Sequence, residues 1–167
     1  MQLDGRALTL VPLSAAHADD LIRIRRTPEV RARWGDLDDD PGFPFEEPES
    51  PRFAVVEGGR VVGMIQYAEE LTPQYRHAGI DLFLDPAVHG RGVGRDAVRT
   101  LARYLIDDRG HHRLVIDPSA DNDAAIRCYA AVGFRPVGVM RGYERDVDGR
   151  GWHDGLLMDL LAADLID

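Results

Sequence analysis

The sequence contains no lysine, so its twenty Lys-or-Arg positions are all arginines. It has a single cysteine, Cys128, which cannot form an internal disulfide and which favours a reducing, cytoplasmic setting. No run of about 18 apolar residues occurs, so we expect no transmembrane helix and no membrane partner. The opening residues, MQLDGRALTL, lack a basic stretch followed by an apolar one, so no secretory signal is expected.

What is present is an acidic chain of 167 residues, 44% of them apolar, with a formal net charge of −9. This size predicts one domain over residues 1–167 with a sizeable core, and the charge argues against a nucleic-acid partner. Between Trp34 and Pro51 lie acidic residues and no basic ones: Asp36, Asp38, Asp39, Asp40, Glu46, Glu47 and Glu49. From Arg91 to Arg113 arginines outnumber acids. The split suggests two ligands of opposite sign, although a solvated loop explains the acidic stretch equally well.

Apolar spacing and turn residues divide the chain into strands and helices. Strands are predicted at 6–13, 52–57, 60–70, 78–85, 113–117, 134–144 and 152–161. Helices are predicted at 14–25, 27–33, 93–107 and from 122 to a stop at Gly133, and 34–51 is predicted to be a loop. Hairpins at both ends flank one central strand–helix–strand unit. This order indicates a mixed α/β sheet with helices on both faces.

The stretch HGRGVGRDAVR, residues 89–99, is a glycine-rich turn that leads into a helix. Such a turn can hold an anion on main-chain N–H groups. A P-loop is excluded because it requires a lysine. A dinucleotide fingerprint is harder to dismiss, since Gly92, Gly94 and Ala97 fit G-x-G-x-x-A and Asp117 could bind a ribose. That fold repeats parallel strand–helix units, however, and hairpin-like strands follow Asp117 instead.

Two linked segments resemble the GNAT N-acetyltransferase superfamily. NDAAIRCYAAVGF (122–134) is similar to its N-x-x-A-x-x-x-Y-x-x-x-G-F block, and 81–105 is similar to its coenzyme-binding strand, loop and helix. The family loop usually reads Q/R-x-x-G-x-G/A, so histidine at its first position departs from the pattern. The resemblance implies acetyl-CoA as co-substrate, no metal, and a mostly antiparallel sheet of about seven strands flanked by helices on both faces. It assigns the coenzyme phosphates to His89, Gly90, Arg91, Gly92, Val93, Gly94 and Arg95.

Within the superfamily, residues 79–84, 116–134 and 30–36 resemble aminoglycoside 6′-N-acetyltransferases. The resemblance implies that Asp81 contacts the amine, that Asp117 is the general base and that Trp34 lies in the substrate pocket. The chemistry needs such groups, because a protonated alkyl amine must lose a proton before it attacks a thioester. Both aspartates also have structural explanations: Asp81 on a solvated strand face and Asp117 in a turn before Pro118.

The same resemblance implies that Tyr129 donates a proton to the departing thiolate and that Asn122 contacts the coenzyme arm. A core tyrosine and a helix N-cap are the structural alternatives. Backbone N–H groups around Phe83 and Leu84 are expected to meet the thioester carbonyl. Glu70, with Glu69 and the acids of 36–49, is expected to form a wall of the acceptor pocket, which would attract a polycation.

Two further features are predicted to be structural. Cys128 has no histidine near it in sequence, so we expect a buried thiol rather than a nucleophile. His111-His112 has no partner at metal-ligand spacing and is interpreted as a loop. The sequence therefore predicts an acetyl-CoA-dependent N-acetyltransferase acting on a small cationic amine, as a monomer or homodimer. An alternative acceptor is a protein N-terminus, an amino acid or another metabolite. An alternative function is that of a non-catalytic acyl-CoA-binding module.

Overall fold

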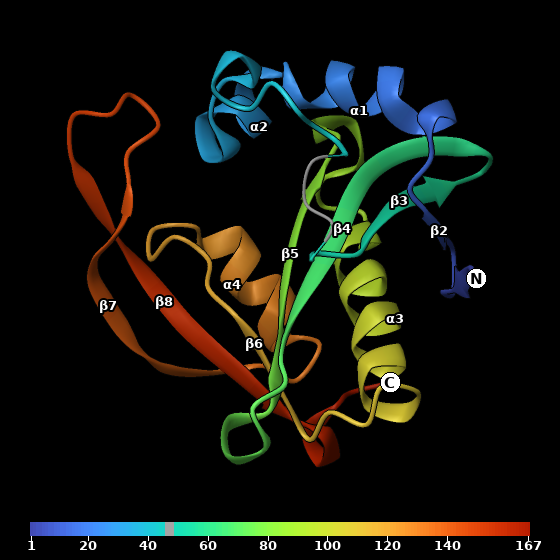
Figure 1. Ribbon diagram of the computed structural model, residues 1–167, viewed down its shortest axis with the longest axis vertical. Coiled ribbons are helices and arrows are strands. Elements are labelled where there is room, and N and C mark those ends of the chain that lie inside the picture. The colour runs from blue at the N-terminus through green and yellow to red at the C-terminus, as the bar shows by residue number, and fades with distance from the viewer. Residues whose placement is uncertain (46–48) are drawn as a thin grey trace.

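The computed structural model describes residues 1–45 and 49–167, and the strands it describes form one sheet (Figure 1). The strands are β1 (Leu3–Asp4), β2 (Thr9–Pro12), β3 (Arg52–Glu57), β4 (Arg60–Glu70), β5 (His77–Leu84), β6 (Arg113–Ile116), β7 (Arg135–Arg145) and β8 (Trp152–Leu161). The helices are α1 (Ala18–Arg25), α2 (Pro28–Trp34), α3 (Val93–Asp107) and α4 (Asp123–Ala130). Each predicted helix is therefore present within a few residues of its expected bounds.

The order across the sheet is β1-β2-β3-β4-β5-β6-β8-β7. Among the described strands β5 and β6 are the parallel pair, and the other neighbours are antiparallel. This confirms the mixed, mostly antiparallel α/β fold, with eight strands instead of about seven because Leu3–Asp4 pairs with β2 ahead of the first predicted strand. A dinucleotide-binding domain would need repeated parallel pairs, so that alternative is wrong.

Helices cover both faces of the sheet because consecutive residues of a strand point to opposite sides. On β4, Met64 packs in a cluster with Leu21 and Ile24 of α1. Its neighbour Ile65 belongs to the larger cluster that contains Leu101 of α3. The helix predicted at 93–107 is confirmed as α3, and Val93, Ala97, Leu101 and Leu105, which recur every four residues, are all buried. The sheet is thus held between two apolar layers.

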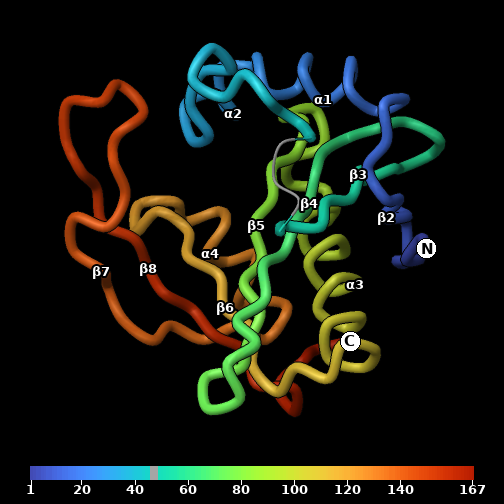
Figure 2. Tube along the Cα trace, in the orientation of Figure 1, coloured from blue at the N-terminus to red at the C-terminus, as the bar shows by residue number. Residues whose placement is uncertain are grey.

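The feature that positions the site is a division of the sheet between β5 and β6. Their pairing is limited to Ala78 with Leu114 and Gly79 with Val115, after which β5 continues to Leu84. Figures 1 and 2 show the two halves of the sheet diverging from this junction, with β5 on one side and β7 and β8 on the other. Main-chain groups at the end of β5 are therefore left without a strand neighbour on that side. Within the described residues, no helix is both long and apolar enough to span a bilayer.

Candidate active site

The glycine-rich turn leads into the N-terminus of α3, as predicted. Gly90 has φ +74° and Gly92, the N-cap of the helix, has φ +81°, a left-handed conformation that favours glycine. A Cβ atom at either position would meet nothing within 4 Å, so the bend presents open backbone. The N-cap makes no side-chain hydrogen bond to the first turn of α3, whose N–H groups face no intrahelical acceptor. Such a helix start is an anion-binding element.

This bend lines a cavity of about 680 Å³ together with the end of β5, α2 and α4. Every loop residue predicted for the coenzyme phosphates except Arg91 lines it directly. The Arg91 guanidinium instead pairs with Glu57 of β3, at 3.1 Å. His89 contributes a contact that the sequence did not specify: its Nε2 donates to the main-chain oxygen of Leu84, at 3.0 Å. This hydrogen bond ties the bend to the end of β5.

The register of β5 determines which of its amides face the cavity. The Asp85 N–H donates to Val62 O (2.7 Å), and β4 and β5 pair without a bulge from Leu84 back to His77. Because hydrogen-bonded pairs alternate along an antiparallel ladder, the Phe83 N–H faces β4 and the Leu82 and Leu84 N–H groups face away from it. Of the two amides expected from sequence, the one at Leu84 is therefore directed at the cleft. Phe83 lines the cavity with its ring instead.

These residues fit an acyl-coenzyme A. The bend offers exposed N–H groups and the nearby charge of Arg95 for a diphosphate, and the β5 amides offer hydrogen bonds to an extended pantetheine arm. On α4, the Asn122 side chain accepts from Ala125 N–H (3.3 Å), so it caps the helix, and it also lines the cavity. Burial raises the pKa of the Cys128 thiol, which also lines the cavity. This keeps the thiol neutral and supports its prediction as a structural residue.

A second cavity of about 470 Å³ adjoins the first, and Arg33, Trp34, Leu82, Asn122 and Tyr129 line both. The two predicted acids, Asp81 and Asp117, lie in the second cavity. Burial raises the pKa of the Tyr129 hydroxyl well above its usual range, and the negative charge of Asp81 raises it further. Tyr129 therefore stays protonated at neutral pH, at the junction of the two cavities.

Asp117 directly follows β6 and is held in place through β8 and β7. The Leu156 N–H donates to Pro118 O at 2.8 Å, which ties the segment after Asp117 to β8. On β7, the Tyr143 hydroxyl donates to Asp117 Oδ2 at 2.5 Å, and this hydrogen bond raises the pKa of Tyr143 to about 12. One carboxylate oxygen of Asp117 is thus oriented by a tyrosine far away in the sequence.

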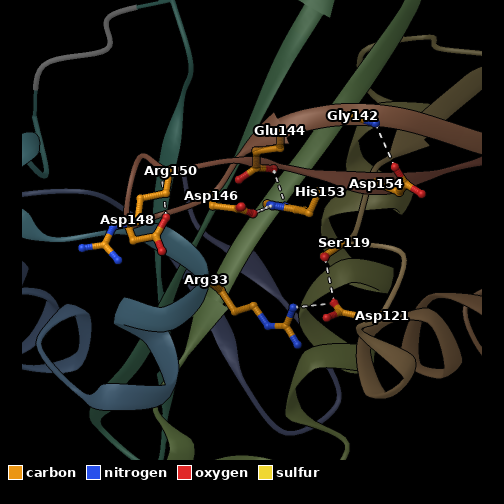
Figure 3. A network of polar contacts seen from close by, with 10 residues as sticks. All are labelled: Arg33, Ser119, Asp121, Gly142, Glu144, Asp146, Asp148, Arg150, His153 and Asp154. Carbon is orange, nitrogen blue, oxygen red and sulfur yellow. Dashed lines mark hydrogen bonds and ion pairs between the residues drawn. The ribbon is translucent and has the colours of Figure 1, made fainter.

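The lining of the second cavity is strongly acidic. Its carboxylates come from β5, the segment after β6, and the β7–β8 hairpin: Asp81, Asp117, Asp121, Glu144, Asp146 and Asp148. Figure 3 shows the polar contacts of this region, with His153 between two of these acids. Its Nδ1 lies 2.9 Å from Asp146 Oδ1, and its Nε2 lies 4.0 Å from Glu144 Oε2. From α2, Arg33 reaches Asp121 at 2.8 Å.

The acids expected to wall this cavity are different from those that do so. Glu70 lies at the far end of β4, paired with His77, and is not among the residues that line these two cavities. Its carboxylate accepts the Thr72 N–H in the following turn (2.8 Å), so the structure does not bring Glu70 together with Asp81 and Asp117. Glu69 instead binds Arg109 (2.9 Å) and His111 (2.7 Å).

The acidic stretch 36–49 also has structural roles where it is described. Asp36 caps a short 3-10 turn by accepting the Asp38 N–H (3.2 Å), and Asp40 pairs with Arg25 (3.4 Å). Glu46 and Glu47 lie outside the described residues. The hairpin acids were missed because their stretch, YERDVDGRG, was interpreted only as strand and turn. The many charged residues of this stretch, which follows the GNAT-like block 122–134, were the sequence feature that could have indicated a second acidic surface.

Two adjoining cavities suit the transfer of an acyl group from a coenzyme donor to an acceptor, which is the reaction of an acyltransferase. Comparison with known proteins agrees. Residues 18–134 match the model of the acetyltransferase (GNAT) family, and the chain belongs to that family. It therefore uses acetyl-CoA as its acyl donor. Among the described residues, no group of three or more His, Cys, Asp or Glu side chains could hold a metal ion.

The relatives have different acceptors. N-alpha-acetyltransferase RimI of Mycobacterium tuberculosis is 30% identical over 152 residues, covering 87% of this chain and 89% of the relative. Aminoglycoside N(6′)-acetyltransferase type 1 of Klebsiella pneumoniae is 39% identical over 75 residues, covering 44% of this chain and 36% of that enzyme. The structure of AAC(6′)-Ib in complex with paromomycin and acetyl-CoA has a TM-score of 0.76 at 21% identity and covers 95% of each chain. These likenesses establish an N-acetyltransferase and leave its acceptor open.

Proposed function

We propose that this acetyltransferase modifies a primary amine of a cationic small molecule by direct attack in a ternary complex, with an aminoglycoside 6′-amine as the first acceptor to test. The acidic lining of the second cavity carries the proposal. Six carboxylates line this cavity, and the other charged or titratable lining groups are one arginine, one histidine and Tyr129. A polycation would be attracted there, and the attraction would weaken as salt screens it.

The acceptor residues first bind and then deprotonate the amine. Asp81 and Asp117 stabilise the ammonium form as it enters, and Asp117, oriented by Tyr143, accepts the proton directly or through a water molecule. The neutral amine is then a competent nucleophile. Because Asp117 lies after β6 and Asp81 on β5, the amine is held across the division of the sheet.

The remaining residues act on the donor. Bound acetyl-CoA supplies an activated acetyl thioester. The Leu84 N–H faces the cleft and can stabilise negative charge on the carbonyl oxygen, with Leu82 N–H as a second donor once it leaves Asp81 Oδ1 (3.0 Å). Tyr129, whose raised pKa keeps its hydroxyl protonated, donates a hydrogen bond to the departing sulfur. As the carbon–sulfur bond breaks, the thiolate takes up the second proton that the attacking nitrogen loses.

The test is coenzyme A release from acetyl-CoA with a panel of aminoglycosides, polyamines, monoamines and peptides with a free N-terminus. We expect turnover of the polycations, with a KM that rises with salt. Asp117→Asn should lower kcat by about 10²- to 10⁴-fold with acetyl-CoA affinity nearly unchanged. Asp107→Asn, an exposed position at the end of α3, is the matched control. Turnover of peptides alone would refute the proposed acceptor class.

A protein N-terminus is the second candidate, because the RimI relative aligns over 87% of this chain. The hairpin acids separate the two acceptors. Glu144→Gln combined with Asp146→Asn should raise the KM for an aminoglycoside strongly and change the KM for a neutral N-terminal peptide little. The opposite ranking would favour the protein acceptor.

A further inference from the structure

Arg25, the last residue of α1, carries a charge in the interior of the protein. The residue is 1% exposed, and it lies behind the cavities rather than among the residues that line them. Burying a guanidinium is costly unless hydrogen bonds and an opposite charge compensate for it. Burial lowers the pKa of Arg25, and its hydrogen bond to Asp40 opposes that change. The contacts of the Arg25 side chain show which parts of the structure it holds together.

The Arg25 guanidinium is bonded to the end of α2. Its Nη2 donates to the main-chain oxygens of Trp34 (3.2 Å) and Gly35 (3.4 Å), and Nη1 donates to Asp40 Oδ2 (3.4 Å). The last carbonyls of a helix lack intrahelical donors, so these hydrogen bonds satisfy groups at the α2 C-terminus. Arg25 thereby connects α1, the end of α2 and the segment that contains Asp40.

The same guanidinium lies over two aromatic rings. Its carbon is 4.7 Å from the ring centroid of Phe43 and 5.6 Å from that of Trp34. Trp34 in turn meets Phe83 of β5 edge-on, with ring centroids 5.1 Å apart. Contact therefore runs without interruption from the buried charge to Trp34 and on to β5. Trp34 lines both cavities, at their junction.

We propose that Arg25 is a positioning residue for acyl transfer: it fixes the Trp34 indole at the junction of the donor and acceptor cavities by binding the end of α2. The expected effect on acceptor kinetics rests on the proposed function, whereas the positioning of the Trp34 ring does not. The acceptor amine must approach the thioester beside this ring. Displacing the ring changes the acceptor geometry while Asp81, Asp117 and the anion-binding bend stay in place.

Arg25→Lys tests the proposal, because lysine keeps the charge but loses the forked donor geometry and the planar stacking. Arg26→Lys, the exposed neighbour, is the matched control. We expect Arg25→Lys to lower kcat/KM for the acceptor by about tenfold or more, since small misplacements of reacting groups cost up to about 10²-fold in rate. Asp40→Asn should lower kcat/KM by less, and it serves if Arg25→Lys does not fold.

Two further measurements separate positioning from loss of stability. In a Trp152→Phe background Trp34 is the remaining tryptophan. Its fluorescence emission should move to longer wavelength in Arg25→Lys, and acrylamide should quench that fluorescence more strongly. The value of kcat/KM for the acceptor in the double variant Arg25→Lys, Trp34→Ala should be no lower than in Trp34→Ala alone. Unchanged emission in a folded variant, or additive effects of the two substitutions, would overturn the proposal. Failure of the proposed function would instead appear in the unmodified enzyme as no turnover of cationic amines, with the emission result still deciding the role of Arg25.

Discussion

Replacing Tyr143 with phenylalanine removes one hydroxyl and with it the hydrogen bond to Asp117 Oδ2, 2.5 Å long. The substitution keeps the ring and every charge. It therefore isolates what that hydrogen bond does for the carboxylate that we propose as general base. If Asp117 accepts the proton of the amine, the loss of this orientation must appear in kcat.

The structure bounds the size of the effect. The hydrogen bond to Asp117 is the main reason why the pKa of Tyr143 lies at about 12 instead of 10.0. A pKa difference of this size corresponds to at most about 3 kcal/mol. Because Tyr143 is 45% exposed, screening by solvent reduces the interaction to about 1 kcal/mol or less. We therefore expect kcat to fall by about two- to fivefold.

The direction follows from the geometry of the hydrogen bond. The Tyr143 hydroxyl orients Asp117 Oδ2, so its loss leaves the carboxylate less well placed to accept the proton of the amine and lowers kcat, with acetyl-CoA affinity little changed. The assay is coenzyme A release at saturating substrates, with Tyr75→Phe, at 74% exposure, as the control. An unchanged kcat in a folded Tyr143→Phe enzyme would show that another group, such as His153, takes the proton.

Three further predictions use other parts of the structure. Tyr129→Phe should lower kcat by about 10²-fold or more without weakening acetyl-CoA binding, measured by single-turnover kinetics and calorimetry, and an unchanged kcat would remove the assigned role. Gly92→Ala puts a side chain at φ +81°, which costs about 1–2 kcal/mol of unfolding free energy and should weaken acetyl-CoA binding, whereas Gly149→Ala at a similar positive φ should leave binding unchanged. Arg109 and His111 hold the pKa of Glu69 below its ordinary value. The ion pairs of Glu69 therefore stabilise the folded state fully at pH values above the ordinary pKa of a glutamate. This stabilisation is lost as the pH falls through the lowered pKa of Glu69. Glu69→Gln should therefore cost about 1–3 kcal/mol in urea unfolding at neutral pH and little in acid; an equal cost at both would contradict the ion-pair assignment.

The parts of the fold that sequence reasoning predicted best are governed by local rules. Apolar residues four apart, such as Leu101 and Leu105, form the buried face of α3. The predicted strands 52–57 and 60–70 are separated by only Gly58 and Gly59, which both have positive φ and form the turn of the β3–β4 hairpin. The bend at Gly90 and Gly92 is equally local, because positive φ values are required wherever the chain turns into α3. The coenzyme side of the site was therefore predictable from consecutive residues.

The acceptor side depends on contacts between distant segments. Glu144 reaches the cavity because the β7–β8 pairing changes register between Met140 and Glu144, an irregularity that no spacing rule specifies. Tyr143 meets Asp117 across 26 residues of sequence for the same reason. Glu70 was misplaced because β4 continues past the cleft, so an acid two residues beyond Ala68 lies at the wrong end of the sheet. Charge alone did not show which acids converge.

A crystal structure of the enzyme with acetyl-CoA and a slow or inert amine acceptor would show directly where the thioester and the amine bind. We expect the diphosphate on the main-chain N–H groups of residues 90–95, and the acetyl carbonyl within hydrogen-bond distance of the Leu84 N–H. The thioester sulfur should lie near the Tyr129 hydroxyl, with the amine between Asp81 and Asp117. A diphosphate bound elsewhere, or a thioester directed away from Tyr129 and the two aspartates, would contradict the account.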